Sequence, residues 1–260
     1  MTDEPLTRKK AAGDGRRARA GGNGRPARSA GAPPRAATPA RPVTLEDVRN
    51  DPEVAVFVRK ADHNLEVLGY TEHSERHAGV VATTARDILL DLGRPARHAE
   101  LAAIAGYLHD VGNVITRLDH GIAAALIARD LLSRMGMPIE EYAEVMAAIG
   151  NHEEQYGEAI SDIAAALILG DKSDVNRERV RNPDPHTFDI HDRVNLATQN
   201  ASVTVDAAAH TITLSLDIDT TVSQVMEYFE IFLSRMLMCR RAAAFLHCEF
   251  ALVINGTRLL

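Results

Sequence analysis

The sequence predicts a mainly α-helical protein that ends in a small α+β module. Three observations support this prediction. Apolar residues recur at helical spacing through most of the chain, aromatic residues make up only 4% of it, and strand-like alternation is confined to the region after residue 200. A core built mostly of Ala, Leu, Ile and Val favours packed helices over large β-sandwiches. With 260 residues, the chain is long enough for a sizeable core in one or two domains.

The first 42 residues differ in composition from the rest of the chain. They are rich in Arg, Ala, Gly and Pro and carry ten basic and three acidic residues, which leaves 19 basic and 33 acidic residues for the remainder. Such a segment buries too little apolar surface to fold, so we predict a disordered basic tail over residues 1–42. The tail could contact RNA, DNA or an acidic partner, but a solvated extension is the simpler interpretation. The acidic remainder argues against general nucleic-acid binding.

Residues 43–182 have the pattern of several helices joined by short connections. Thr44 and Asp47 form a capping-box pattern at the first helix, and apolar residues then recur at helical spacing as far as Gly69. Pro138 suits the first turn of a helix, whereas Gly170 is expected to end one. Beyond Gly69, we expect helices over residues 72–92, 101–108, 120–135, 138–149 and 160–169.

The pattern changes after Val180, where a stretch rich in Asn and Pro breaks the chain. Alternating apolar residues predict a hairpin with strands over 203–206 and 211–218. A helix capped by Thr221 and running to about residue 246 should follow, and then a last strand from Glu249. This β-β-α-β order fits a small α+β domain over residues 183–260, with the helix covering one face of the sheet. The same apolar helix could instead supply a homodimer face, although a core role better fits its place between strands.

Several features bear on the cellular compartment. No apolar run reaches the ~18 residues needed to cross a bilayer. The charged N-terminus is not followed by the hydrophobic segment of a secretory signal. Cys239 and Cys248 make neither a disulfide framework nor a CxxC metal site. We therefore expect a cytoplasmic protein with no membrane partner.

Histidine and aspartate residues gather at the ends of the predicted helices. Imidazole and carboxylate groups held rigidly at helix ends suit a divalent transition metal. A bundle that brought these segments together would concentrate four imidazoles and two carboxylates. That set is too large for one tetrahedral ion and suits two ions that share a carboxylate. The candidate ligands are His77, His109, Asp110, His120, His152 and Asp171.

Five short segments containing these residues occur in a characteristic order. They are His77-Ala-Gly-Val-Val-Ala, Leu108-His-Asp-Val-Gly, Asp119-His-Gly-Ile-Ala, Asn151-His-Glu and Leu169-Gly-Asp-Lys-Ser-Asp. In order and spacing they resemble the HD-domain metal-dependent phosphohydrolases, over about residues 70–181. The resemblance implies an HD-type helical bundle over residues 43–182. It also implies two divalent ions (Mn, Fe, Mg or similar) on the six candidate ligands, with Asp110 as the bridge.

Two positions leave room for other interpretations within that family. Asn113 stands where many relatives, including the HD-GYP cyclic-dinucleotide phosphodiesterases, have lysine. The Gly-Tyr-Pro part of that signature is also missing, which disfavours cyclic di-GMP as a substrate. His73 competes with His77 as the first ligand, because His73-Ser-Glu-Arg resembles the family's His-Ser-x-Arg opening. The spacing to His109 and the apolar residues that follow favour His77, and His73 would then line the pocket from the same helix face.

The resemblance implies a phosphohydrolase that acts on a nucleotide or a related small phosphoester. Metal ions at the site would lower the pKa of a bound water, and the resulting hydroxide would attack phosphorus without a protein nucleophile. Asp110 and Glu153 are the candidate catalytic residues. Glu153 could act as a proton-transfer group, and a surface role for it fits the sequence equally well. Asp174 could orient a ligand histidine. Candidate substrate-binding residues are His73 and the cations that follow the last ligand, Lys172, Arg177, Arg179 and Arg181.

Two other functions are compatible with the same fold. Some relatives with a mixed-valence di-iron centre are oxygenases that cleave C–C or C–P bonds, and bound iron with O₂ consumption would identify that case. The chain could also be a regulator that senses a nucleotide without turnover and binds a partner, or a second copy, through its C-terminal module. A complete ligand set argues against a domain that has lost its metal site.

Overall fold

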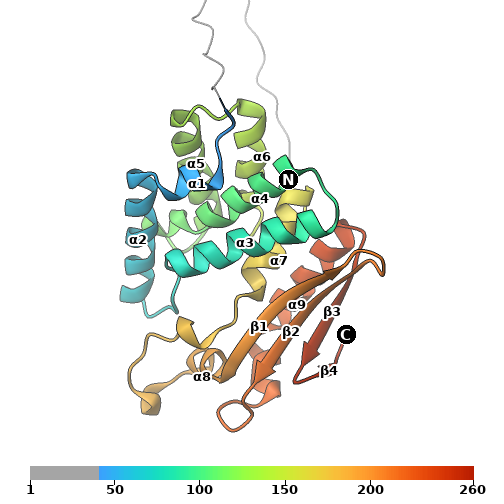
Figure 1. Ribbon diagram of the computed structural model, residues 1–260. Coiled ribbons are helices and arrows are strands. Elements are labelled where there is room, and N and C mark those ends of the chain that lie inside the picture. The colour runs from blue at the N-terminus through green and yellow to red at the C-terminus, as the bar shows by residue number, and fades with distance from the viewer. Residues whose placement is uncertain (1–40) are drawn as a thin grey trace, which may run out of the picture. The chain divides into compact units, whose positions relative to one another are not determined.

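The computed structural model describes residues 41–260, which belong to one compact unit (Figure 1). Helices fill the first part of this range, and a small four-stranded sheet lies at the C-terminal end. The predicted fold class is therefore confirmed. The predicted tail lies almost entirely outside the described residues, and the domain boundary at residues 182 and 183 stays a prediction.

The helical layer matches most of the predicted segments. The Thr44 capping box is present at the first helix, and α3, α4 and α7 pack on one another while α5 pairs with α6. Side-chain caps fix the starts of several helices, such as Asp51 before α2 and Ser74 before α3. The elements are α1 (Leu45–Arg49), α2 (Pro52–Val67), α3 (Glu75–Asp91), α4 (Ala96–Leu108), η1 (Val111–Val114), α5 (His120–Arg134), α6 (Ile139–Gly150) and α7 (Asp162–Ser173).

The prediction that Gly170 ends a helix is wrong, because α7 continues to Ser173. Gly170 is needed for close packing instead, since a Cβ there would lie 2.9 Å from the backbone oxygen of Val81 on α3. Gly106 on α4 has the same role, with its Cβ position 2.9 Å from Cα of Ala82. These two contacts let α3 approach α4 and α7 closely. Asp171 lies on a helix rather than in a turn, because α7 continues to Ser173.

The C-terminal part has the predicted β-β-α-β order. Strands β1 and β2 form an antiparallel hairpin, and α9 then crosses over so that β3 runs parallel to β2. A short fourth strand completes the sheet order β1-β2-β3-β4. These elements are η2 (Arg177–Arg179), η3 (Pro185–Thr187), α8 (Ile190–Ala197), β1 (Thr198–Asp206), β2 (Thr211–Ile218), α9 (Val225–Phe245), β3 (Glu249–Ile254) and β4 (Thr257–Arg258).

Several details of this part differ from the prediction. Strand β1 begins at Thr198 rather than at residue 203, and the short strand β4 was not expected. Helix α8 was not expected, because its eight residues are too few for a helical repeat of apolar residues to be recognised in the sequence. Thr221 does not cap α9: its hydroxyl donates to Asp219, and Gln224 forms the capping box at Val225 instead. The hydrogen bonds to Asp219 place Thr221 in a turn before the helix, and α9 begins at Val225, later than predicted.

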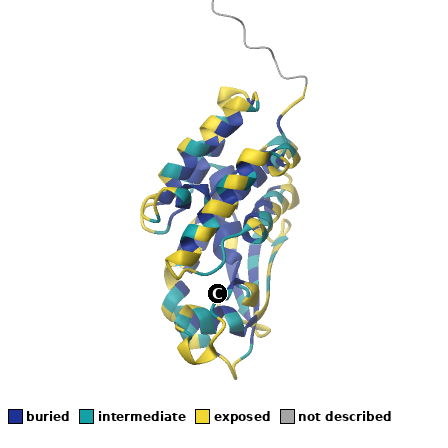
Figure 2. Cartoon of the chain, turned by 90° about the vertical axis from the view of Figure 1, so that its left-hand side faces the viewer, coloured by how far each residue is buried: buried dark blue, intermediate teal, exposed yellow. Residues whose placement is uncertain are grey.

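Helix α9 joins the sheet to the helical layer. It packs on β2 and β3 with one side and on α7 with another. Its buried residues Tyr228, Phe232 and Met236 recur at helical spacing, and the alternate residues of β2 are buried in turn. Figure 2 shows buried residues on the inward faces of the helices and exposed residues on the outward faces. The core role predicted for α9 therefore matches its packing, and a homodimer stays a prediction.

No helix in the described part of the chain is long and apolar enough to cross a membrane.

Candidate metal centre

The structure brings together all six residues that the sequence predicts as metal ligands. They come from five helical segments and sit mostly at helix ends, and the four imidazoles are almost fully buried. They are His77 in the first turn of α3, His109 at the C-cap of α4 and Asp110 after it, His120 at the start of α5, His152 just after α6, and Asp171 in the last turn of α7.

Two of the imidazoles share one carboxylate. Nε2 of His77 lies 3.3 Å from Nε2 of His109. Both of these nitrogens are 3.6 Å from Oδ1 of Asp171. Nε2 of His77 is also 3.6 Å from Oδ2 of Asp110. Ligand atoms of His77, His109 and Asp171 thus form one compact group that could hold an ion.

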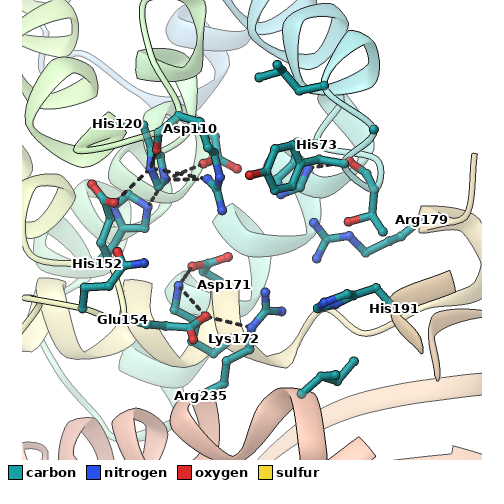
Figure 3. A pocket seen from close by; sticks show the side chains of 18 of the residues that line it. His73, Asp110, His120, His152, Glu154, Asp171, Lys172, Arg179, His191 and Arg235 are labelled. Atoms are coloured by element: carbon teal, nitrogen blue, oxygen red, sulfur yellow. Dashed lines mark hydrogen bonds and ion pairs between the residues drawn. The ribbon is translucent and has the colours of Figure 1, made fainter. Parts of the chain in front are cut away.

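The other two imidazoles, His120 and His152, lie near Asp110 (Figure 3). Nε2 of His120 is 3.1 Å from Nε2 of His152 and 3.2 Å from Oδ1 of Asp110. The second oxygen of Asp110, Oδ2, is 3.2 Å from Nε2 of His109. Asp110 therefore presents one oxygen to each pair of histidines, which is the arrangement expected of a bridging carboxylate.

Hydrogen bonds at Nδ1 orient the rings. His109 and His152 each donate from Nδ1 to the carbonyl oxygen three residues earlier, Gly106 at 2.8 Å and Ile149 at 2.6 Å. A carbonyl oxygen can only accept, so Nδ1 carries a proton in both rings and Nε2 is the nitrogen that faces the centre and can bind a metal. This is the tautomer that a metal ligand requires.

The donor atoms fit divalent ions. Two nitrogens that each lie ~2.1 Å from one ion are roughly 3.0–3.4 Å apart. The Nε2 pairs at 3.3 Å and 3.1 Å match this separation. At such distances two facing imidazole nitrogens share either a proton or a metal ion, since two lone pairs alone repel each other. A set of imidazole and carboxylate donors suits transition metals such as Mn, Fe or Zn.

Residues 70–193 match the family model of the HD domain. This part of the chain is an HD domain. Over 146 residues the chain is also 27% identical to an uncharacterized protein of Methanocaldococcus jannaschii, in an alignment that covers 48% of this chain and 56% of that protein. The chain thus spans little more than half the length of that relative. The resemblance to the HD-domain superfamily is confirmed, and the matched region extends into α8, beyond the predicted end at residue 181.

The charges in the HD domain's centre are strongly coupled. Burial opposes protonation of His109, but the neighbouring carboxylates of Asp110 and Asp171 outweigh it and raise its pKa to about 10. Burial likewise opposes ionisation of Asp110, yet His109 and His120 hold the pKa of this carboxyl well below its usual range. The pKa of His152 is lowered by burial and by the charges of His109 and His120. Without metal, the centre is therefore held together by a buried ion pair.

We expect the metal-free protein to lose stability as the pH rises towards 10. His109 has an ordinary pKa of 6.5 and a folded-state pKa of about 10, so its contribution is fully present below 6.5 and is lost as the pH rises through 10. Thermal melts in EDTA between pH 6 and 10.5 should show this slope in the wild type. The slope should be weaker in His109→Gln and unchanged in His98→Gln, which alters an exposed histidine. Equal slopes in all three proteins would contradict the assignment.

Two carboxylates outside the ligand set orient the other two imidazoles. Nδ1 of His77 donates to Oδ2 of Asp174 at 2.7 Å, as the sequence predicts for this aspartate. Burial opposes ionisation of Asp174, but His77 and Arg179 outweigh it and lower its pKa. On the other side, Nδ1 of His120 lies 3.1 Å from Oε2 of Glu153.

Asp174→Asn should weaken metal binding roughly tenfold to a hundredfold, because it removes the charge that fixes the His77 ring. Metal titration by calorimetry on the wild type and the variant measures this effect. Glu178→Gln is a matched control, since Glu178 is exposed and lies 3.8 Å from the same Arg76 that Asp174 pairs with. The idea fails if both variants bind metal equally well.

Glu153, the predicted proton-transfer group, lines the cavity, and both of its carboxylate oxygens have a partner. Its Oε1 accepts from the backbone nitrogen of Gly121 at 2.6 Å, while Oε2 faces His120. Both oxygens are therefore engaged in holding the start of α5. This arrangement favours a positioning role for Glu153 over the predicted catalytic one.

The centre opens into a cavity of about 550 Å³. His73 and Lys172 line it, as predicted, but His73 precedes the cap Ser74 and so does not share a helix face with His77. Nδ1 of His73 donates to the backbone oxygen of Thr71 at 2.6 Å. Its pKa is lowered by burial and by the charge of Arg179, so the ring is neutral and its Nε2 can accept a hydrogen bond.

Two of the predicted substrate cations lie elsewhere. Arg177 is exposed, Arg181 pairs with Asp62, and neither lines the cavity. Sequence reasoning missed Arg117 and Arg235, which do line it. Nothing in the local sequence marks these two arginines, because each reaches the cavity through the packing of its helix or loop rather than by its distance along the chain from a ligand.

Proposed function

We propose that this HD domain is a metal-dependent phosphohydrolase that acts on a nucleotide or a related small phosphoester. One observation carries the proposal: two pairs of histidines, joined by Asp110, lie beside a cavity that also contains cationic side chains. A volume of about 550 Å³ is within the range of pockets for small molecules. The membership of the superfamily supports the same class of reaction.

The six ligands would hold two divalent ions. Such ions, when bound, lower the pKa of a coordinated water and stabilise negative charge on phosphoryl oxygens. Lys172 adds positive charge beside the metal centre, since its Nζ is 2.6 Å from Oδ2 of Asp171. Arg117 does so from the other side, with Nη1 3.3 Å from Nε2 of His120. In the described part of the chain neither serine nor cysteine lines the cavity, and Thr71 is the residue there with an aliphatic hydroxyl.

The test combines metal analysis with a substrate panel. The purified full chain should contain close to two transition-metal ions. With added Mn²⁺ it should hydrolyse an aryl phosphate mono- or diester and one or more nucleotides. Bound iron with O₂ consumption and no hydrolysis would instead identify an oxygenase. Protein that binds nucleotide but neither metal nor oxygen would point to a regulatory domain. Either result would overturn the proposal.

A further inference from the structure

The cavity has a second cationic region, separate from the metal ligands. Arg179, Arg235 and His191 line it on the side away from His120 and His152 (Figure 3). Arg179 follows α7, whereas His191 and Arg235 come from α8 and α9. The C-terminal elements therefore build part of the same cavity as the HD helices.

Arg179 is fixed by the fold with one edge turned to the cavity. Its side chain is only 4% exposed. Nε donates to the backbone oxygen of Glu72 at 3.1 Å, and Nη1 donates to the backbone oxygen of Asp174 at 2.8 Å. Among the described residues, Nη2 has no hydrogen-bond partner. A guanidinium this well buried is costly unless its remaining donor finds an acceptor.

Arg235, on α9, is also held in place by neighbouring side chains. Its Nε donates to Oε1 of Glu154 at 2.8 Å, and its guanidinium lies 4.5 Å from the ring centroid of Phe232. Oε2 of Glu154 accepts from the hydroxyl of Ser234 at 2.8 Å, so the carboxylate is fixed as well. Both Nη groups of Arg235 are without a partner in the described chain. The open end of this fork matches the geometry of an oxyanion.

Two guanidinium groups beside one cavity repel each other unless an anion lies between them. Burial and the charge of Arg235 lower the pKa of Arg179, and together they outweigh the opposite effect of the carboxylates of Asp174, Glu72 and Asp171. The nearby carboxylates already have partners. Glu154 holds Arg235, Asp189 caps α8 and Asp192 accepts from Asn182. Oδ2 of Asp174 lies 3.9 Å from Nη1 of Arg179 and also pairs with His77 and Arg76. None of these carboxylates accepts a hydrogen bond from Nη2 of Arg179 or from either Nη group of Arg235.

We propose that Arg179 and Arg235 form a second anion subsite, and that the substrate carries a second oxyanion besides the phosphoryl group hydrolysed at the metal centre. This inference rests on the proposed function and narrows its substrate class to small molecules with two separated anionic groups. The second group is a phosphate or a carboxylate, since both present paired oxygens to a guanidinium. Arg235 makes α9 a determinant of substrate choice rather than only a support for the sheet.

Matched substrate pairs test the inference on the full chain. Adenosine 3′,5′-bisphosphate is compared with adenosine 5′-monophosphate for a second phosphate, and 3-phosphoglycerate with glycerol 3-phosphate for a carboxylate. The wild type should have the higher kcat/KM for the compound with two anionic groups in one or both pairs. Arg235→Ala should reduce that preference roughly tenfold or more, because hydrogen bonds between charged groups are lost. Arg240→Ala, an exposed arginine on the same helix, should leave the preference unchanged.

A binding measurement separates this inference from the proposed function. Calorimetric titration of adenosine 3′,5′-bisphosphate into metal-free protein needs no turnover, and Arg235→Ala should weaken binding by a similar factor. Arg235→Lys, which keeps a charge but not the fork, should fall between. If binding of adenosine 3′,5′-bisphosphate depends on Arg235 but no phosphoester is hydrolysed, the subsite is supported and the proposed function is contradicted. Two results would overturn the subsite. One is hydrolysis of aryl phosphate with no preference for compounds that carry a second anionic group. The other is equal affinity of the alanine variants of Arg235 and Arg240 for adenosine 3′,5′-bisphosphate.

Discussion

Asp110→Asn should abolish both metal binding and hydrolysis while the helical fold remains. Asp110 is the ligand that faces both histidine pairs, with Oδ1 3.2 Å from Nε2 of His120 and Oδ2 3.2 Å from Nε2 of His109. The amide replaces one donor oxygen with an NH₂ group and removes the negative charge. Metal-ion stabilisation of a phosphoryl transition state amounts to several kcal/mol, so we expect a loss of roughly a thousandfold or more in rate.

The measurement is metal content per chain together with turnover of an aryl phosphate. Circular dichroism should report the wild-type helical content, because the substitution preserves shape. Asp130→Asn is the matched control: this aspartate lies on α5, is exposed and pairs only with the neighbouring Arg129 at 3.2 Å among the described residues. An Asp110→Asn protein that kept its metal would show that the bridge is misassigned.

The sequence could predict that the six candidate ligands lie close together, because most of them stand at helix ends. A helix end fixes where a side chain starts, and short connections leave little freedom in how neighbouring ends meet. His109 and His120 illustrate this, since each lies within one residue of a predicted helix boundary. Asp174 was within reach for the same reason, three residues after Asp171 in the turn that closes α7.

Other parts of the site depend on packing that no local pattern records. Arg235 reaches the cavity only because α9 lies against α7 as well as on the sheet. Gly170 has the local signature of a helix end, but its actual requirement is the close approach of α3. Arg181 follows the ligands as closely in sequence as Arg179, yet it turns towards Asp62 on α2. Long-range contacts decided each of these cases.

Asn113 shows how a departure from the family pattern can keep a role at the site. Its side-chain nitrogen donates to Oδ1 of Asp110 at 3.0 Å and to the backbone oxygen of the same residue at 2.9 Å. The residue is 3% exposed. An amide here holds the bridging carboxylate by hydrogen bonds, whereas the lysine of many relatives would place a charge in this region.

Gly112→Ala should strongly destabilise the fold near the site, whereas Gly150→Ala should be tolerated. A Cβ on Gly112 would lie 2.0 Å from the backbone oxygen of His120 and 2.5 Å from the backbone nitrogen of Ala124. Backbone atoms cannot rotate away, so η1 and the start of α5 would have to separate. We expect a loss of about 3 kcal/mol or more, equivalent to a fall in melting temperature of roughly 6 °C or more.

Gly150 makes the comparison sharp because it lies at the end of α6, next to the same centre. A Cβ there would meet nothing within 4 Å, and its backbone is not left-handed. Alanine should therefore be neutral or stabilise by up to about 1 kcal/mol, through its better helix propensity. Thermal melts of both variants in EDTA exclude any contribution from bound metal. Because His120 moves with α5, Gly112→Ala should also weaken metal binding when EDTA is removed, and shifts of the same sign in the two variants would contradict the packing described for η1.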